Sequence, residues 1–272
     1  MSTRIHHLNC ATMSPAVTAG GVVPRRMVAH CLLIEGPHGL TLVDSGFGSG
    51  DLAEPRKRMG RAFVRMMGPA LDPAETAAAQ VRALGHLVED VTDVVLTHLD
   101  LDHAGGIGDF PSATVHVLAE ELEAAKSRSA VREKNRYVPA QWAHGPRWLA
   151  HDDEQGGESW MGFESVAVLE DDILLVPLRG HTRGHSGVAV RRPEGGWFLH
   201  AGDAYFFHGE KEQPPTCPSG LTMFQNLVQM DRGARRANAE RLRTLHADHG
   251  DEVTMFSAHD AQEYDALAGE TA

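Results

Sequence analysis

The feature that most constrains this chain is a cluster of metal-ligand side chains directly after a buried-type strand. Residues 91–97 carry an apolar core and are predicted to form that strand. The six residues that follow contain four ligand-type side chains: His98, Asp100, Asp102 and His103. Imidazole and carboxylate groups are common protein ligands of divalent ions, so their density here predicts a metal site at the end of the strand. One segment of this kind could serve two ions.

Three later segments repeat the arrangement of a strand followed by a ligand-type residue. The expected strands are 173–178, 197–201 and 253–257, and the ligand-type residues after them are His185, Asp203 and His259. Loops at strand ends are where rigid scaffolds present functional groups. We therefore expect these three side chains to meet the first four at one site.

Composition narrows the class of protein. The 272 residues include 25 Lys and Arg against 37 Asp and Glu, a net charge of −12, which argues against a nucleic acid or an anionic membrane as the partner. The 17 histidines suit metal binding, whereas the three cysteines are too scattered for a disulfide framework or a thiolate zinc site. No apolar run approaches the length of a membrane span. We expect a small-molecule substrate and a cytoplasmic location.

Strand and helix signals alternate along the chain without repeats, which is typical of an α/β protein. Turn residues predict hairpins within 28–43 and 187–201, and capping signals predict helices over 73–84, 119–127 and 231–249. The polar stretch at about 128–160 is interpreted as a partly helical insertion or lid over the site. The Met-rich segment 59–67 is interpreted as a packing or dimer helix, in preference to a wall for an acyl chain, so a homodimer is compatible with the sequence.

With these motifs in place, the chain resembles the metallo-β-lactamase-fold superfamily of hydrolases, and in layout its acyl-homoserine lactonase-like branch. That family has a His-x-His-x-Asp-His motif followed by a His, an Asp and a final His, and the resemblance covers about 44–259. It implies an αββα four-layer sandwich with a dinuclear metal site at one edge of its two sheets. We expect a single domain over 1–272.

The resemblance also implies a role for each matching position. The first metal would be held by His98, Asp100 and His185, and the second by Asp102, His103 and His259. Asp203 would bridge the two ions. Asp44 and His181 would support the ligands without binding metal themselves.

Asp100 departs from the family pattern, in which most members have His at this position. With two divalent ions, three carboxylates and a bridging hydroxide, the site would sum to about zero charge, which suits Mn or Fe better than a histidine-rich site does. Zinc stays the first expectation, with Mn or Fe as alternatives, and Asp100→His is expected to shift the preference toward zinc. A carboxylate here also resembles the flavodiiron branch, so an iron-dependent oxidoreductase is the alternative from another class, although the flavin domain of that branch is missing.

The resemblance implies a hydrolase that uses a metal-bound hydroxide on a small ester, and a lactone is the substrate we expect first. Asp102 would orient the nucleophile and relay its proton. Tyr205 is a candidate donor to the developing oxyanion, although lactonases of this fold place their tyrosine one residue later, where Phe206 stands here. A thioester hydrolase is the other hydrolytic alternative, and a metal-binding protein without catalysis is the least favoured one.

Overall fold

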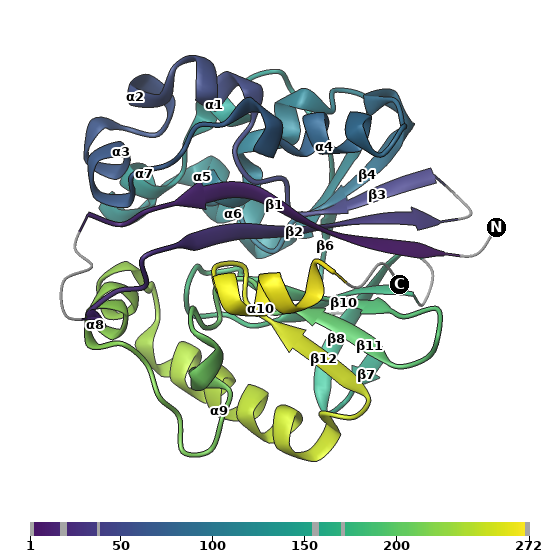
Figure 1. Cartoon of the computed structure of the whole chain (residues 1–272), viewed down its shortest axis with the longest axis vertical. Coiled ribbons are helices and arrows are strands. Elements are labelled where there is room, and N and C mark those ends of the chain that lie inside the picture. The colour runs from purple at the N-terminus through teal and green to yellow at the C-terminus, as the bar shows by residue number, and fades with distance from the viewer. Residues whose placement is uncertain (1–2, 17–20, 37–38, 154–157, 170–171, 270–272) are drawn as a thin grey trace.

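The computed structural model describes residues 3–16, 21–36, 39–153, 158–169 and 172–269. Within them the strands form two six-stranded sheets that pack face to face, with helices on the outer face of each (Figure 1). The expected αββα sandwich is therefore confirmed. The assignment of 1–272 to one domain stays a prediction.

The first sheet contains the strands of the N-terminal half, in chain order from one edge to the other. Its members are β1 (Arg4–Met13), β2 (Met27–Gly36), β3 (Gly39–Val43), β4 (Val91–Val95), β5 (Thr114–Leu118) and β6 (Arg147–His151). The first three run antiparallel, and β3 to β6 run parallel. Because parallel strands end at the same edge, the segment after β4 lies beside the one after β3.

The second sheet has the order β12-β11-β10-β9-β8-β7. Its members are β7 (Glu158–Trp160), β8 (Phe163–Leu169), β9 (Ile173–Pro177), β10 (Ser186–Arg191), β11 (Trp197–His200) and β12 (Val253–Phe256). Neighbours are antiparallel except β11 and β12, which run parallel. The loops after β9, β11 and β12 therefore open on one side of this sheet.

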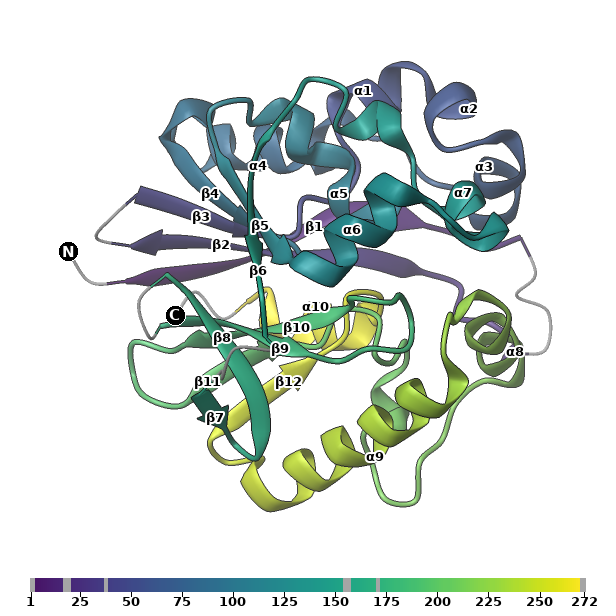
Figure 2. The same ribbon diagram turned by 180° about the vertical axis from the view of Figure 1, so that it is seen from behind.

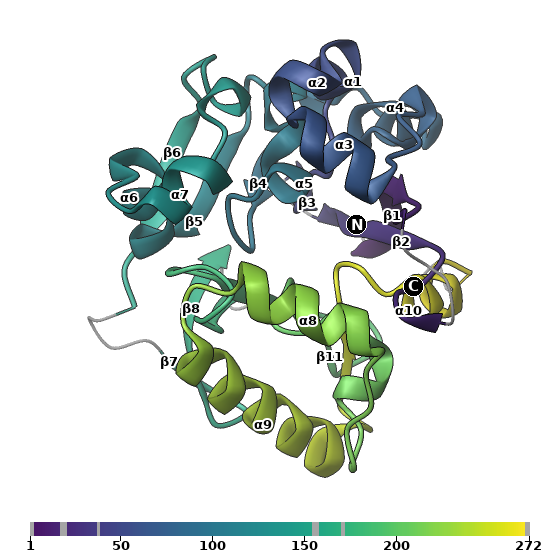
Figure 3. The same cartoon turned by 90° about the vertical axis from the view of Figure 1, so that its left-hand side faces the viewer.

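Helices cover both outer faces, as the reverse view in Figure 2 also shows. Over the first sheet lie α1 (Ser49–Ala53), α2 (Pro55–Arg58), α3 (Arg61–Met67), α4 (Ala77–Ala83), α5 (Leu101–Ala104), α6 (Ala119–Ser127) and α7 (Val131–Arg136). The second half contributes α8 (Ser219–Val228), α9 (Arg232–His249) and α10 (Ala261–Leu267). In Figure 3, α3 and α7 lie above α8 on the same side of the molecule. No helix among the described residues is long and apolar enough to span a bilayer.

Three apolar clusters hold these layers together. One lies between the first sheet and its helices, one between the second sheet and α9, and the third joins the inner faces of the two sheets. The third cluster includes Leu32 and Val43 from the first sheet and Leu175, Val188 and Phe256 from the second. Burial of these side chains fixes how the two sheets, and thus their loops, face each other.

Several predicted elements are confirmed, and two need correction. The hairpins, the 119–127 helix and the long helix capped by Asp231 are present. The helix predicted over 73–84 is split, because Thr76 is extended and caps a new helix at Ala77, while the carboxylate of Glu75 accepts two hydrogen bonds from Thr12. The 128–160 stretch is not one insertion: its described part contains α7 and the edge strands β6 and β7. Residues 154–157 lie outside the described residues.

Candidate metal centre

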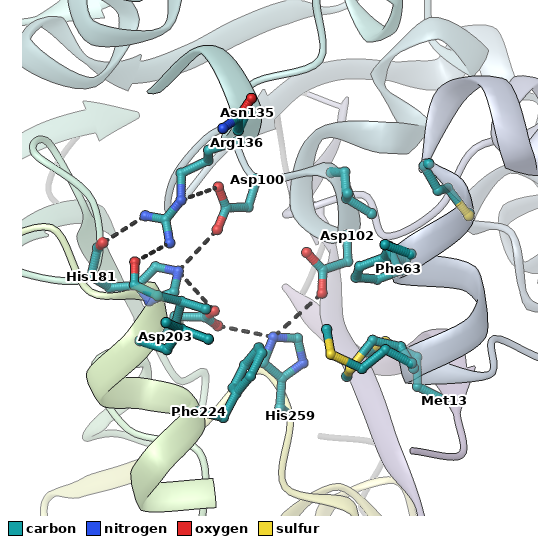
Figure 4. A pocket seen from close by; sticks show the side chains of 18 of the residues that line it. Met13, Phe63, Asp100, Asp102, Asn135, Arg136, His181, Asp203, Phe224 and His259 are labelled. Carbon is teal, nitrogen blue, oxygen red and sulfur yellow. Dashed lines mark hydrogen bonds and ion pairs between the residues drawn. The ribbon is translucent and has the colours of Figure 1, made fainter. Parts of the chain in front are cut away.

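Six of the seven predicted ligands come together at the facing edges of the two sheets. His98, Asp100, Asp102 and His103 lie on the turn after β4 and on α5, Asp203 follows β11, and His259 follows β12. Two groups of possible ligand atoms result, each within 4.8 Å: His98, Asp100, His181 and Asp203 form the first, and Asp102, His103 and His259 form the second. Figure 4 shows Asp100, Asp102, Asp203, His181 and His259 facing one cavity.

Asp203 lies between the two groups and presents one carboxylate oxygen to each. Its Oδ2 lies 3.2 Å from Nε2 of His181 and 3.9 Å from Nε2 of His98. Its Oδ1 lies 3.3 Å from Nε2 of His103 and 3.1 Å from Nε2 of His259. This is the geometry that a bridging ligand requires.

The structure exchanges the positions expected for His181 and His185. Nδ1 of His185 donates to the carbonyl of Leu178 (2.9 Å), so its Nε2 carries the lone pair, and that lone pair accepts the backbone N–H of Asp203 (2.9 Å). Both ring nitrogens of His185 are thereby used by the backbone. Nε2 of His181 instead lies 3.0 Å from Oδ2 of Asp100. The prediction of His185 as ligand and His181 as support is therefore corrected: His181 belongs to the cluster and His185 positions Asp203.

Hydrogen bonds on the far side of the rings orient the other histidines. Nδ1 of His103 bonds Oδ2 of Asp44 (2.7 Å), and Nδ1 of His259 bonds the carbonyl of Val28 (2.7 Å). Each bond leaves the Nε2 lone pair facing the cluster, as metal-binding histidines require. Asp44 also accepts from the backbone N–H and the hydroxyl of Thr97, both at 2.8 Å. Its predicted supporting place fits this geometry, and it adopts a left-handed backbone (φ 56°), a strained conformation of the kind found at functional sites.

Glycines in the ligand turn are needed for space. A Cβ on Gly105 would lie 2.2 Å from a carboxylate oxygen of Asp51, and one on Gly106 would lie 2.4 Å from the carbonyl of Ser45. Gly105 has a right-handed helical backbone (φ −59°), so its freedom to adopt unusual angles is not what the turn uses. The turn instead uses these glycines for close packing against the loop after β3 and against α1.

Electrostatics favour a cation between the carboxylates. Burial opposes ionisation of Asp203, yet the neighbouring His259 and His103 hold its pKa well below the usual range. Burial likewise opposes protonation of His103, but Asp203 and Asp44 raise its pKa well above the ordinary value. In the metal-free protein, protons therefore occupy positions at which a divalent ion would displace them.

Buried polar atoms without hydrogen bonds show that the residues present fit metal ions. Within the described part of the chain, Nε2 of His98, Nε2 of His103 and Oδ1 of Asp203 have no hydrogen-bond partner although they are buried. An unsatisfied buried polar group costs about 1–3 kcal/mol, so three in one place need a common explanation. Two divalent ions, with imidazole and carboxylate ligands, provide one.

Tyr205 is not brought to the site. Its hydroxyl donates to Glu263 at 3.1 and 3.2 Å on the side of the second sheet, and the ring is buried in the cluster under α9. Phe206, the next residue, lines the cavity instead and stacks on His259 with ring centroids 5.1 Å apart. The structure therefore gives the oxyanion role expected for Tyr205 no geometric support.

The cavity above the two clusters has a volume of about 710 Å³ and two unlike walls. One wall is apolar and comes from β1, β2, α3, α8 and their flanking loops: Met13, Met27, Met59, Phe63, Met66, Met67, Phe224, Leu227 and Met230. The other is polar and comes from α7: Arg132, Asn135 and Arg136. The less favoured interpretation of segment 59–67, a wall for an apolar chain, is the one that the geometry supports.

The sequence did not predict two contacts that hold the site together, one made by Arg136 and one by Glu121. Arg136 lies 3.3 Å from Oδ1 of Asp100 through its Nε. Glu121 is buried on α6 and accepts hydrogen bonds from the backbone N–H groups of Leu99 (2.9 Å) and Gly184 (3.1 Å). These bonds tie the turn after β4, here called the first ligand turn, to the loop that carries His181. The four-residue spacing of Arg132 and Arg136 on one helical face was the available signal for the first contact. Nothing distinguished Glu121 from its exposed neighbours in a Glu-rich helix.

Comparison with known proteins agrees with this arrangement. A model of the metallo-beta-lactamase superfamily matches residues 24–248. A Mycobacterium tuberculosis protein named "Probable metallo-hydrolase" is 41% identical over 272 residues, which cover 99% of this chain and 84% of that protein. The N-acyl homoserine lactonase AttM of Agrobacterium fabrum is 26% identical over 262 residues, or 93% of this chain and 89% of AttM.

Solved structures of similar fold include lactonases. A mutant of AiiA from Bacillus thuringiensis, with N-decanoyl-L-homoserine bound at its active site, superposes with a TM-score of 0.75 at 17% identity and covers 100% of both chains. AidC, described as a dizinc quorum-quenching lactonase, gives a TM-score of 0.56 at 15% identity and covers 87% of this chain and 74% of its own. At these identities the likeness shows the fold.

Proposed function

Because the chain belongs to the metallo-β-lactamase superfamily and is a metal-dependent hydrolase, we propose that it opens a lactone ring that carries an apolar acyl chain, as in an N-acyl homoserine lactone. The observation that carries the proposal is the cavity, whose apolar wall and polar wall meet above the two ligand clusters. Enclosed volumes of about 300–1,000 Å³ are typical of small-molecule sites. Relatives and structural neighbours with lactonase names support the same substrate class.

The ligand roles form part of this proposal. One ion would be held by His98, Asp100 and His181 and the other by Asp102, His103 and His259, with Asp203 shared between them. Bound in this way, two divalent ions would supply a hydroxide nucleophile near neutral pH and would polarise the ester carbonyl. Zinc is our first expectation for both, with manganese or iron as alternatives.

The chain's own residues would bind and orient the substrate. The methionines and Phe63 and Phe224 would hold the acyl chain by burial of apolar surface, since methionine adapts to chains of different shape. The ring would then lie over the clusters. Water adds to the carbonyl carbon, the ring C–O bond breaks, and the ring oxygen takes the proton. Asp102, which is partly exposed to the cavity with Oδ2 3.6 Å from Nε2 of His259, is placed to hold that proton.

The first experiment measures metal content of protein purified without added metal, beside hydrolysis of acyl homoserine lactones of increasing chain length, linear esters and thioesters. We expect two ions per chain and kcat/KM values that rise with acyl length. Asp203→Asn is expected to lower both metal content and kcat/KM, the latter at least about tenfold, because loss of a shared ligand weakens both positions.

A matched pair on α8 tests the role of the cavity wall. Phe224 lines the cavity, whereas its neighbour Met223 is 71% exposed and is not among the lining residues. Phe224→Ala should lower kcat/KM for the longest acyl chain at least about fivefold relative to the shortest, because buried apolar contact is lost, and Met223→Ala should leave that ratio unchanged. Turnover of thioesters or linear esters but not of lactones would refute the substrate class. Two irons with oxygen turnover and no hydrolysis would contradict the proposal as a whole.

A further inference from the structure

Arg136 is fixed at the edge of the first ligand cluster by contacts from three directions. Its Nη1 donates to the carbonyl of His181 (2.6 Å), its Nη2 donates to the carbonyl of Val228 (2.6 Å), and its Nε faces Oδ1 of Asp100 (3.3 Å). The side chain is only 11% exposed. A guanidinium held in this way cannot move into solvent without breaking contacts to α8 and to the His181 loop (Figure 4).

Asp100 divides its two oxygens between Arg136 and the cluster. Oδ2 lies 3.0 Å from Nε2 of His181 and 3.4 Å from Nε2 of His98. Oδ1 points the other way, toward the guanidinium. One oxygen is therefore left for an ion, while the other is held by a fixed positive charge.

This contact changes the charge expected at position 100. The estimate from the sequence counted Asp100 as an unbalanced negative charge that a histidine would remove. Arg136 contributes +1 to the −1 of Asp100, so the two side chains together are neutral, as a single neutral histidine is. The argument from charge for a harder metal is thereby offset.

We propose that Asp100 and Arg136 act as one neutral unit, in which Arg136 is a positioning residue that orients the Asp100 carboxylate and balances its charge. The inference rests on the dinuclear site of the proposed function and goes beyond it by assigning a residue outside the ligand set. It requires that the two positions depend on each other. Asp100→His alone leaves a buried guanidinium without its carboxylate beside the ions, and Arg136→Met alone leaves a buried carboxylate without its cation.

Arg132 offers a matched control one turn earlier on α7. It lines the same cavity, but its guanidinium donates to the carbonyl of Gln229 (3.1 Å), and no ion pair between it and the cluster is found among the described residues. Removal of Arg132 changes the charge near the cavity by the same amount without touching Asp100. If any positive charge near the cavity had the same effect, Arg132→Met and Arg136→Met would behave alike. If Asp100 and Arg136 form a specific pair, only Arg136→Met has the effect.

The test is a double-mutant cycle read by Zn²⁺ affinity, measured by competition with a chromophoric chelator in the absence of substrate. Asp100→His is expected to lower the affinity for one of the two Zn²⁺ ions at least about tenfold. Adding Arg136→Met to the same chain is expected to restore that affinity to within about threefold of wild type. Arg132→Met should give no restoration. Additive effects of Asp100→His and Arg136→Met would overturn the proposal.

A second readout uses the metal-free protein, so the inference does not depend on loading or on activity. In metal-free protein, Arg136→Met should lower the Tm more when it is made in the wild-type chain than when it is made in Asp100→His. The reason is that Asp100→His no longer has the carboxylate that Arg136 balances. Where Asp100→His does not fold, Asp100→Asn takes its place. Equal Tm losses in both backgrounds would mean that Arg136 only ties α7 to α8. Failure of lactone hydrolysis with an intact cycle would refute the substrate and leave this unit standing.

Discussion

Two histidines four residues apart illustrate how a single hydrogen bond assigns a role. His181 and His185 stand in the same Gly-rich loop after β9, and both side chains are buried. The backbone N–H of Asp203 reaches Nε2 of His185 and occupies its lone pair, whereas Nε2 of His181 stays open to the carboxylates. A metal ligand needs a free lone pair, so the two residues cannot exchange roles without rebuilding the loop after β11.

Tyr205 provides a prediction at the scale of one residue. Tyr205→Phe is expected to leave kcat/KM within about twofold, because the hydroxyl bonds Glu263 and lies outside the cavity lining. It should lower the free energy of unfolding by about 1 kcal/mol through loss of a buried hydrogen bond. Steady-state kinetics and urea unfolding of the same preparations measure both quantities. A loss of kcat/KM beyond tenfold with unchanged KM would restore an oxyanion role.

At the scale of elements, the geometry of the site depends on close contact between the loop after β9 and helix α6. The loop after β9 packs on the start of α6, where a Cβ on Gly184 would lie 2.1 Å from the backbone nitrogen of Glu121. The side chain of the same glutamate accepts the N–H of Gly184 and of Leu99. The first ligand turn and the His181 loop are thus held at a fixed separation through one buried carboxylate.

Gly184→Ala tests this contact between elements. We expect a loss of about 1–3 kcal/mol in the free energy of unfolding, since the obstructing atoms belong to backbone and cannot rotate away. The His181 loop should also shift, with weaker Zn²⁺ binding by chelator competition. Gly269→Ala is the control, because no atom lies within 4 Å of its added Cβ. Equal stability of Gly184→Ala and Gly269→Ala would show that α6 can move to accept the added methyl group, so that this contact does not hold the His181 loop in place.

At the scale of the whole molecule, the inner faces of the two sheets enclose a group of histidines away from the cavity. Nδ1 of His7 on β1 lies 2.7 Å from Nε2 of His30 on β2, and His200 on β11 bonds the carbonyl of His30. His30 stacks on Phe256 of the second sheet with centroids 4.3 Å apart. Burial, and then the neighbouring His200, lowers the pKa of His7 to about 4.

The sheet interface should therefore be sensitive to acid. His7 takes up a proton near pH 6.5 in the unfolded chain but only near pH 4 in the folded one, so the unfolded state binds more protons between these values. Stability should then fall as pH drops from about 6.5 to about 4, by up to about 3 kcal/mol from this residue. His7→Asn should flatten that decline, and His249→Asn, at a half-exposed helix end, should not. Parallel pH profiles for wild type and His7→Asn would contradict this assignment.

The sequence by itself determined the strands that lead to the site, six of the seven residues that meet in the two clusters, and the class of fold, because period, turn residues and local spacing act over a few neighbouring residues. It could not choose between His181 and His185, which stand in the same short loop. The contacts that decided the rest join distant segments: Asp203 with His185, Arg136 with Asp100, and α3 with α8 across the cavity. The first two contacts join loops or helices within one half of the molecule, and the third depends on how the two sheets pack, which is decided by burial of the whole core.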